Sequence, residues 1–377
     1  ELAIYEIVKG NVTMTNHEFY MDLALKNASA MKGQTSPNPL VGSVIVRDGE
    51  IVGIGAHMKA GGPHAEIHAL RMAGDKAKGA TAYVTLEPCS HHGRTGPCAV
   101  ALVEAGVSRV VIAILDPNPV VAGRGVKILE DAGIEVIVGV REAESRKMNE
   151  VFNKYIVTKK PFVTLKAATT LDGKIAAHTG HSQWITSSDA RTDVHHLRSE
   201  NEAILVGVNT IIKDDSELTA RIPGGRNPIR IIMDTRLRIP LDAKVVVDGK
   251  APTWIFTGRD VDEKKVDQLI GAGVKVFKTS SIDFVAPEEV LTILGEQGVT
   301  SLFIEAGGTV NASFFEKQLI DKVVLYVAPK LIGGKDAPTF LEGSGLTAMS
   351  EAVDLVDCSF EQVGVDWKFT GYPVYKS

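Results

Sequence analysis

The sequence has few cysteines, no long hydrophobic run and no excess of positive charge. Three cysteines in 377 residues cannot form a disulfide framework, so we expect reduced thiols and a cytoplasmic protein. No run approaches the ~18 apolar residues of a membrane span, and the start ELAIYEIVKGNVT lacks the basic and apolar regions of a secretory signal. The net charge of −5 offers no extended positive surface for nucleic acid. These absences argue against secreted, membrane and nucleic-acid-binding proteins.

The chain is too long for one typical hydrophobic core, and its strand and helix patterns alternate throughout. We therefore predict two three-layer α/β domains. A charged, helix-like stretch over residues 141–160 ends before Pro161, where a new strand pattern begins. We place the boundary near Thr158, which leaves an N-terminal extension (1–13), a first domain (14–158) and a second domain (159–377).

Local patterns predict the elements of both domains. Thr15 and Glu18 form a capping-box pattern that opens a helix through about Met31, and Asp48-Gly49 predicts a hairpin turn. In the first domain we expect strands at 40–46, 51–56, 82–86, 109–115 and 135–140, and helices at 64–73, 98–104 and 126–132. In the second domain we expect strands at 162–168, 203–207, 229–234, 253–257, 274–277, 301–308 and 322–328, with helices between most of them.

Two of the three cysteines, Cys89 and Cys98, stand downstream of His64-Ala65-Glu66. Zinc binds thiolates and imidazoles in a tetrahedron, and a set of three protein ligands leaves one position for water. Glu66 lies close enough to His64 to reach that water without binding the metal. The zinc-deaminase signature is H-x-E followed by P-C-x-x-C; here eight residues rather than two separate the cysteines. We predict a catalytic zinc rather than buried thiols beside a solvated histidine.

This arrangement suits hydrolytic loss of ammonia from an amidine-like ring carbon, with Glu66 moving the proton from water to the leaving nitrogen. Two other classes stay open at this point. One is a nucleic-acid (transfer-RNA-type) base deaminase with an accessory α/β domain, and the other is a zinc protein without catalysis. The third cysteine, Cys358, has no partner motif, and we expect it to be packed in the interior.

Several longer motifs carry a family resemblance. TSPNPLVGSVIV, GIGAHMKAGGPHAE and EPCSHHGRTGPC, followed by KAATTLDGKIA, SQWITS, VGVNTI, DDSELTAR and FIEAGGTVNASF, resemble the bacterial bifunctional riboflavin-biosynthesis deaminase/reductase. The resemblance implies a cytidine-deaminase-like domain followed by a dihydrofolate-reductase-like domain, with zinc and NADPH as cofactors. It also implies small-molecule substrates: a diamino-hydroxy-phosphoribosylaminopyrimidine is deaminated, and the ribosyl chain of the product is then reduced to a ribityl chain. We further expect a homo-oligomer, a dimer or a tetramer.

Around the predicted metal, Asn38 in Pro37-Asn38-Pro39 can offer donors and an acceptor to a pyrimidine edge, although a turn asparagine is the alternative. The resemblance supports His57 and the loop 91–95 as substrate contacts, with histidine and arginine side chains as potential phosphate donors. His68 lies one helical turn after His64, and we expect it to pack behind the site, because a fourth ligand would displace the water.

In the second half no strand is followed by G-x-G-x-x-G, which argues against a Rossmann dinucleotide site. Gly307-Gly308 before a helix offers a phosphate cradle, with a plain tight turn as the alternative. The resemblance assigns the cofactor to Ala168, Trp184, Thr210, Asp214, Gly307 and Gly308. It assigns the sugar-phosphate substrate to Ser182, Arg198, Leu218, Arg221 and Glu305. The guanidinium groups of Arg198 and Arg221 can each donate two hydrogen bonds to a phosphate ester. Lys166, Asp214 and Glu305 are candidates for the acid that donates a proton in the reduction.

Overall fold

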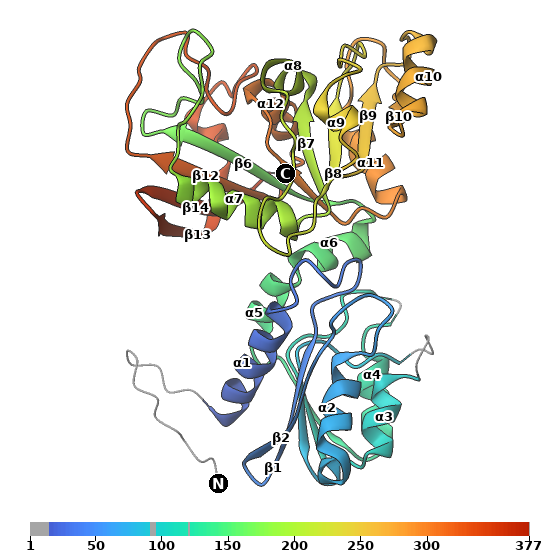
Figure 1. The fold of residues 1–377 in the computed structure, drawn as a ribbon. Helices are drawn as coiled ribbons and strands as arrows, with labels where there is room; N and C mark the ends of the chain where they lie inside the picture. Colours follow the sequence, from blue (N-terminus) through green and yellow to red (C-terminus); the bar gives the residue numbers. More distant parts are fainter. Residues whose placement is uncertain (1–14, 91–95, 120, 377) are drawn as a thin grey trace. The chain divides into compact units, whose positions relative to one another are not determined.

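The computed structural model describes residues 15–90, 96–119 and 121–376, and its contacts divide the chain into two compact units between Thr158 and Lys159 (Figure 1). Our interpretations of residues 1–13 as an extension and of the loop 91–95 as a source of phosphate donors lie outside the described residues. None of the described helices has the length and apolar character needed to cross a membrane.

The first unit contains a five-stranded sheet in the order β2-β1-β3-β4-β5. Its strands are β1 (Gly42–Arg47), β2 (Glu50–Ala56), β3 (Thr81–Val84), β4 (Arg109–Ile112) and β5 (Glu135–Val138). β1 runs antiparallel to both of its neighbours, while β3, β4 and β5 are parallel. The predicted hairpin is confirmed: Asp48 and Gly49 between β1 and β2 both have positive φ, as a two-residue hairpin turn requires.

Helices cover both faces of this sheet because its central strands alternate buried side chains between the two sides. Val44 and Val46 pack with one helical layer, whereas Ile45 packs with the other. The first layer contains α1 (Asn16–Ser29) and α5 (Glu142–Met148); the second contains α2 (Ala65–Ala73), α3 (Cys98–Glu104) and α4 (Arg124–Asp131). The predicted capping box is present at Thr15 and Glu18. A 3-10 turn, η1 (Gly74–Ala77), and the helix α6 (Glu150–Thr158) complete the unit.

The second unit contains a nine-stranded sheet in the order β10-β9-β8-β7-β11-β6-β12-β14-β13. Each strand pairs parallel with its neighbour along the sheet from β10, through β9, β8, β7, β11 and β6, to β12. β14 then pairs antiparallel with both β12 and β13. Their bounds are β6 (Phe162–Thr170), β7 (Ala203–Gly207), β8 (Ile229–Met233), β9 (Thr253–Thr257), β10 (Lys275–Lys278), β11 (Ser301–Ile304), β12 (Lys322–Ala328), β13 (Asp354–Val363) and β14 (Asp366–Val374).

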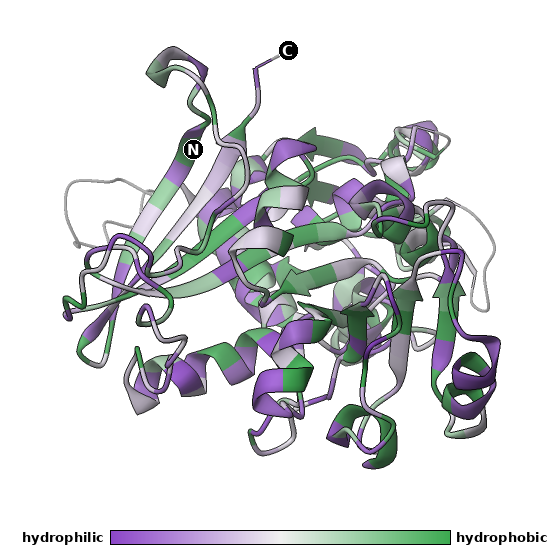
Figure 2. Cartoon of the chain, turned by 90° about the horizontal axis from the view of Figure 1, so that it is seen from above, coloured by the Kyte–Doolittle hydropathy of each residue, from purple (hydrophilic) through white to green (hydrophobic). Residues whose placement is uncertain are grey.

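Two hydrophobic layers pack on this sheet. Four helices lie on one face: α7 (Ser188–Glu200), α8 (Val208–Asp214), α9 (Lys244–Val247) and α10 (Glu263–Gly271). Two lie on the other: α11 (Pro287–Glu296) and α12 (Gly308–Glu316). In Figure 2 the strands in the middle of the sheet are mostly hydrophobic, while the helices alternate hydrophobic and hydrophilic residues. The predicted class, two α/β units with helices on both sheet faces, is confirmed.

The C-terminal hairpin corrects two expectations. We predicted no strand after residue 328, yet β13 and β14 extend the sheet to Val374, with a short 3-10 turn, η2 (Met349–Glu351), before them. The expectation that Cys358 is packed is wrong, because it lies exposed on β13, the last strand of the sheet. Its thiol donates a hydrogen bond to the Leu355 carbonyl oxygen at 3.3 Å.

Candidate functional site

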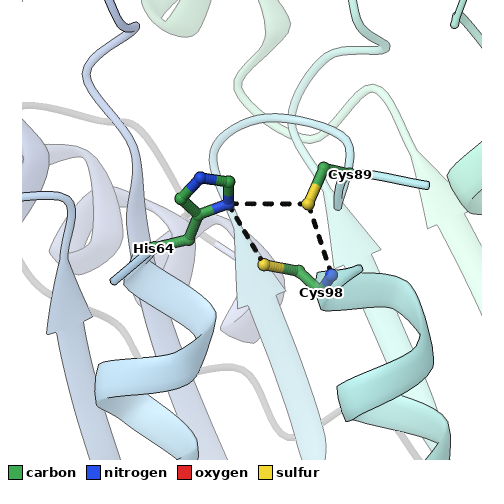
Figure 3. Close-up of side chains that lie close together, drawn as sticks. All are labelled: His64, Cys89 and Cys98. Carbon is green, nitrogen blue, oxygen red and sulfur yellow. Dashed lines mark hydrogen bonds between the residues drawn. The ribbon is translucent and has the colours of Figure 1, made fainter. Parts of the chain in front are cut away.

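Three side chains from separate segments converge in the first unit. The Nδ1 of His64 lies 3.5 Å from the Sγ of Cys89 and 3.3 Å from the Sγ of Cys98 (Figure 3). Zinc bonds of ~2.3 Å to sulfur and ~2.0 Å to nitrogen, in a tetrahedron, put such ligand atoms ~3.5 Å apart. The observed spacing therefore fits a zinc ion without rearrangement, and the structure brings the three predicted ligands together.

Helix starts place two of these ligands. His64 is the N-cap of α2, and Cys98 is the first residue of α3. The amide of Cys98 donates to the Sγ of Cys89 at 3.3 Å, and uncapped amides at a helix start favour a thiolate. The contact with the Cys98 thiol lowers the pKa of Cys89, and the contact with Cys89 raises the pKa of Cys98. Cys89 is therefore the cysteine of the pair that ionises more easily and can offer a thiolate to a metal ion.

The donor set has three members among the residues that the structure describes. His68 lies on the next turn of α2 and is not one of them, and its packing behind the site stays a prediction. Such a set is typical of catalytic rather than structural zinc.

Glu66 lies in the first turn of α2 with its side chain buried. Its Oε2 has no hydrogen-bond partner among the described residues, and the carboxyl lines the same cavity as His64 and Cys89. Burial raises the pKa of Glu66 to about 7. A buried carboxyl oxygen without a hydrogen-bond partner is costly for a fold and is common where a proton must be moved.

The cavity beside the ligands has a volume of ≈ 330 Å³, and both Asn38 and His57 line it. The Nδ1 of His57 faces the Pro63 carbonyl oxygen at 3.1 Å, and its Nε2 lies 3.0 Å from the Asn38 Nδ2. Because a carbonyl only accepts, Nδ1 carries the proton and Nε2 accepts from the Asn38 amide. Burial lowers the pKa of His57 and keeps the ring neutral. His57 thus has both nitrogens engaged, which fits the orientation of Asn38 better than donation to a phosphate.

Our sequence reasoning missed several side chains of this cavity, among them Asp116, Asn118, Phe152 and Ile156. A signal was available for the first two. They stand a few residues after the end of β4 at Ile112, and polar residues after a parallel strand lie at the carboxyl edge of the sheet, where ligands bind in α/β proteins.

In the second unit, Glu305 follows β11 and forms a buried ion cluster with two cations. Arg198 on α7 donates from Nε and Nη2 to the two carboxylate oxygens at 2.6 and 2.9 Å, and the Lys166 Nζ lies 3.5 Å away. Burial alone would raise the pKa of Glu305, but Arg198 and Lys166 outweigh burial and hold it at about 2. Glu305 is therefore a carboxylate at neutral pH and does not donate a proton.

We assigned the Arg198 guanidinium to a phosphate, but it already donates two hydrogen bonds to Glu305. Its Nη1 donates a third, to the Thr219 carbonyl oxygen at 3.1 Å. Arg221 lies near this cluster and is exposed, so its guanidinium remains the better candidate for a phosphate. His195, one turn before Arg198, sits close to both arginines; burial and their charges lower its pKa to about 4.

Leu218 differs from our expectation in one respect. Its side chain is buried in the hydrophobic core of the second unit, and its φ is +53°. A substrate contact at this position would therefore involve the backbone rather than the side chain.

The predicted cofactor residues gather at the carboxyl ends of adjacent parallel strands. Ala168 lies near the end of β6, α8 with Thr210 and Asp214 follows β7, and Gly307 follows β11, which pairs with both strands. Gly307 is the N-cap of α12 and brings no side chain to its uncapped amides. Such an edge with a helix start fits the pyrophosphate of a nicotinamide dinucleotide.

Ser182 and Trp184 line a smaller cavity of ≈ 230 Å³, together with Thr170 at the end of β6. Trp184 is 64% exposed, and the Arg191 guanidinium lies 4.5 Å from its ring centroid. The Arg191 guanidinium on α7 therefore holds the Trp184 ring in place, and the exposed part of the ring is available to a planar ligand.

Two protein-family models match the chain. Residues 14–114 match the cytidine and deoxycytidylate deaminase zinc-binding region, and residues 161–369 match the RibD C-terminal domain. The first match contains the three metal-ligand candidates and Glu66, and the second contains the ion cluster around Glu305.

Full-length relatives match as well. The riboflavin biosynthesis protein RibD of Bacillus amyloliquefaciens is 47% identical over 357 residues, which cover 94% of this chain and 96% of that protein. The structure of Acinetobacter baumannii RibD is 40% identical with a TM-score of 0.84, covering 95% of this chain and 99% of that one. A diaminohydroxyphosphoribosylaminopyrimidine deaminase/5-amino-6-(5-phosphoribosylamino)uracil reductase of Thermotoga maritima is 36% identical with a TM-score of 0.82, over the same shares of both chains.

Proposed function

This chain belongs to the RibD family of bifunctional riboflavin-biosynthesis enzymes, and from that premise we propose how its residues divide the two reactions. The protein is a zinc-dependent deaminase and an NADPH-dependent reductase. It deaminates the diamino-hydroxy-phosphoribosylaminopyrimidine and then reduces the ribosyl side chain of 5-amino-6-(5-phosphoribosylamino)uracil.

For the deaminase, His64, Cys89 and Cys98 would hold zinc, which supplies a Lewis acid that makes water nucleophilic near neutral pH. Glu66 takes the proton from the water and delivers it to the leaving nitrogen, so the C–NH₂ carbon becomes a carbonyl and ammonia departs. Asn38, oriented by His57, presents its amide to the pyrimidine edge. The observation that carries this assignment is the buried, unpartnered Oε2 of Glu66 beside the three-ligand set.

For the reductase, NADPH supplies the hydride. The carboxyl edge of β6, β7 and β11 would position the nicotinamide at Ala168, and Arg221 would bind the substrate phosphate beside the backbone of Leu218. Of the three candidate acids, Glu305 is excluded by its low pKa and Asp214 is exposed on α8. Lys166, held by Glu305 at 3.5 Å, is the proton donor that remains.

A coupled assay tests both reactions in one chain. The purified protein is given the authentic pyrimidine with NADPH, and ammonia, NADPH absorbance and bound zinc are measured. We expect one zinc per chain, and chelation should end ammonia release while NADPH oxidation on the deaminated substrate continues, because only the first unit holds ligand candidates among the described residues. Ammonia release from transfer RNA but not from the pyrimidine would support the nucleic-acid deaminase instead.

The two glycines at the start of α12, its N-cap Gly307 and its first residue Gly308, make separable predictions. A Cβ on Gly307 would meet open space where the cofactor is expected, and its φ of −77° suits any residue. We therefore expect Gly307→Val to raise the KM for NADPH by about tenfold or more and to leave deamination and stability unchanged. A Cβ on Gly308 would lie 2.5 Å from the Thr339 carbonyl oxygen, so Gly308→Ala should lower stability instead. Equal loss of both activities in Gly307→Val would contradict the cofactor assignment.

We further propose that the protein works in the cytoplasm as a homo-oligomer and without nucleic acid. Two reduced thiols at a metal site suit a reducing compartment. The C-terminal hairpin supports self-association: β13 is the last strand of the sheet, its outer edge pairs with no other strand that the structure describes, and Phe360 on it is 70% exposed. A second copy could cover this edge, and sedimentation equilibrium would show a dimer or a tetramer rather than a monomer.

A further inference from the structure

Glu87 is a buried carboxylate that neither proposed reaction uses, and it lines the same cavity as His64 and Glu66. Glu87 is 6% exposed and accepts four backbone N–H bonds. Its Oε2 accepts from Asp116 at 3.1 Å and Gly123 at 2.9 Å. Its Oε1 accepts from Gly125 at 2.8 Å and Val126 at 3.2 Å. Hydrogen bonds to a charged acceptor are about twice as strong as neutral ones, so this carboxylate is a strong anchor.

The four donors belong to one stretch of chain, residues 116–119 and 121–126, which we call the wall segment. It leads from the end of β4 into the first turn of α4. Asp116, Asn118 and Val121 of this segment line the cavity that contains His64 and Glu66. The opposite end of the segment begins α4, whose N-cap Gly123 has no side chain, so Glu87 takes the place of a cap.

Glu87 also stands two residues before the metal-ligand candidate Cys89. The chain between them lies directly against the wall segment: a Cβ on Gly125 would approach the Pro88 carbonyl oxygen to 2.0 Å. No side chain could be inserted there without moving one of the two backbones. A single carboxylate therefore joins the segment that carries a metal ligand to the segment that forms the cavity wall.

We propose that Glu87 is a positioning residue for the deaminase substrate. It fixes the wall segment relative to the metal ligands, so that the side chains of this segment contact the substrate at the correct distance from the metal. This inference rests on the deaminase assignment above. It differs from a role in general stability, because loosening the wall segment weakens substrate binding while zinc and Glu66 stay in place.

Glu87→Gln tests the proposal with almost no change in volume. An amide has one acceptor oxygen, and its NH₂ group would face two backbone N–H groups, releasing one end of the wall segment. We expect the KM for the pyrimidine substrate to rise about tenfold or more, with kcat within about threefold and zinc at one per chain. Amides of the wall segment should exchange hydrogen faster, while those of α2 should not. If the glutamine variant fails to fold, Glu87→Asp, which keeps the charge but withdraws the oxygens, should show the same split.

Ser145→Ala is the matched control. Ser145 is also buried in the same unit, and its hydroxyl donates to the Thr85 carbonyl oxygen at 2.6 Å rather than to the wall segment. It should lower stability without raising KM. An unchanged KM in both Glu87 variants, or a loss of kcat together with zinc, would overturn the proposal. A rise in KM for Ser145→Ala as large as for Glu87→Gln would do the same. Turnover by the wild-type protein decides the deaminase assignment separately.

Discussion

Glu66→Gln is expected to abolish ammonia release, by about a thousandfold or more, while the protein keeps its zinc. The substitution preserves the shape of the side chain but removes the group that accepts and returns a proton. Glu66 is buried, its Oε2 has no partner among the described residues, and it lines the cavity beside the metal ligands. Ammonia release under saturating substrate and zinc content per chain are the two measurements.

Two controls accompany this variant. NADPH oxidation on the deaminated substrate should be unchanged, because the reductase residues lie in the other unit. Glu104→Gln makes the same chemical change at the exposed end of α3, the helix that begins at Cys98, and should leave ammonia release unchanged. Undiminished release by Glu66→Gln would remove Glu66 from the mechanism. Loss of zinc from that variant would instead mean that Glu66 acts on the metal site.

Arg198→Leu is expected to destabilise the second unit by about 3–5 kcal/mol and to abolish NADPH oxidation. The substitution leaves the carboxylate of Glu305, whose side chain is 9% exposed, with Lys166 at 3.5 Å as its one ion-pair partner among the described residues. All three tryptophans lie in the second unit, so tryptophan fluorescence during urea unfolding reports this unit alone.

The double variant Arg198→Leu/Glu305→Gln separates charge burial from catalysis. Removing the carboxylate's charge as well should recover at least half of the lost stability, since no uncompensated anion remains buried. NADPH oxidation should not recover, because Lys166 has lost the carboxylate that holds it. A double variant as unstable as Arg198→Leu would show that packing of the arginine, and not the buried charge, stabilises the unit.

The predicted strands of the two sheets were found where the apolar runs are strongest. β7 and β9, for example, are buried along almost their whole length, and such strands appear in the sequence as short continuous apolar stretches. The C-terminal hairpin has no such signal. β13 is mostly exposed, and its pairing with β14 shifts register between Val356 and Ser359, so neither a continuous run nor a regular alternation marks it. The same exposure explains why Cys358 was misplaced.

The site shows a similar division. The types and order of the metal-ligand candidates and of Glu66 are visible in the sequence, since helix starts bring His64 and Glu66 within one turn. The sequence does not show which charged residues pair with one another. The chemistry of Arg198 suits a phosphate, yet the fold brings it to Glu305, which lies 107 residues away along the chain. His57 likewise became an orienting residue only because Asn38 and the Pro63 carbonyl occupy its two nitrogens.

From the sequence alone follow the two α/β halves, the three-ligand metal set, the acid beside it and the glycine turn before α12. The strand and helix runs, Glu66 beside His64 and the glycine turn are short-range patterns along one element. The three metal-ligand candidates were recognised by residue type and order, and the fold brings them together from separate segments. Only the tertiary structure decides that Glu87 anchors residues 116–119 and 121–126, that Asp116 and Asn118 line the cavity, and that Glu305 lies between Arg198 and Lys166. These contacts join segments tens of residues apart, and the order and packing of strands select the partners from many side chains of equal chemistry.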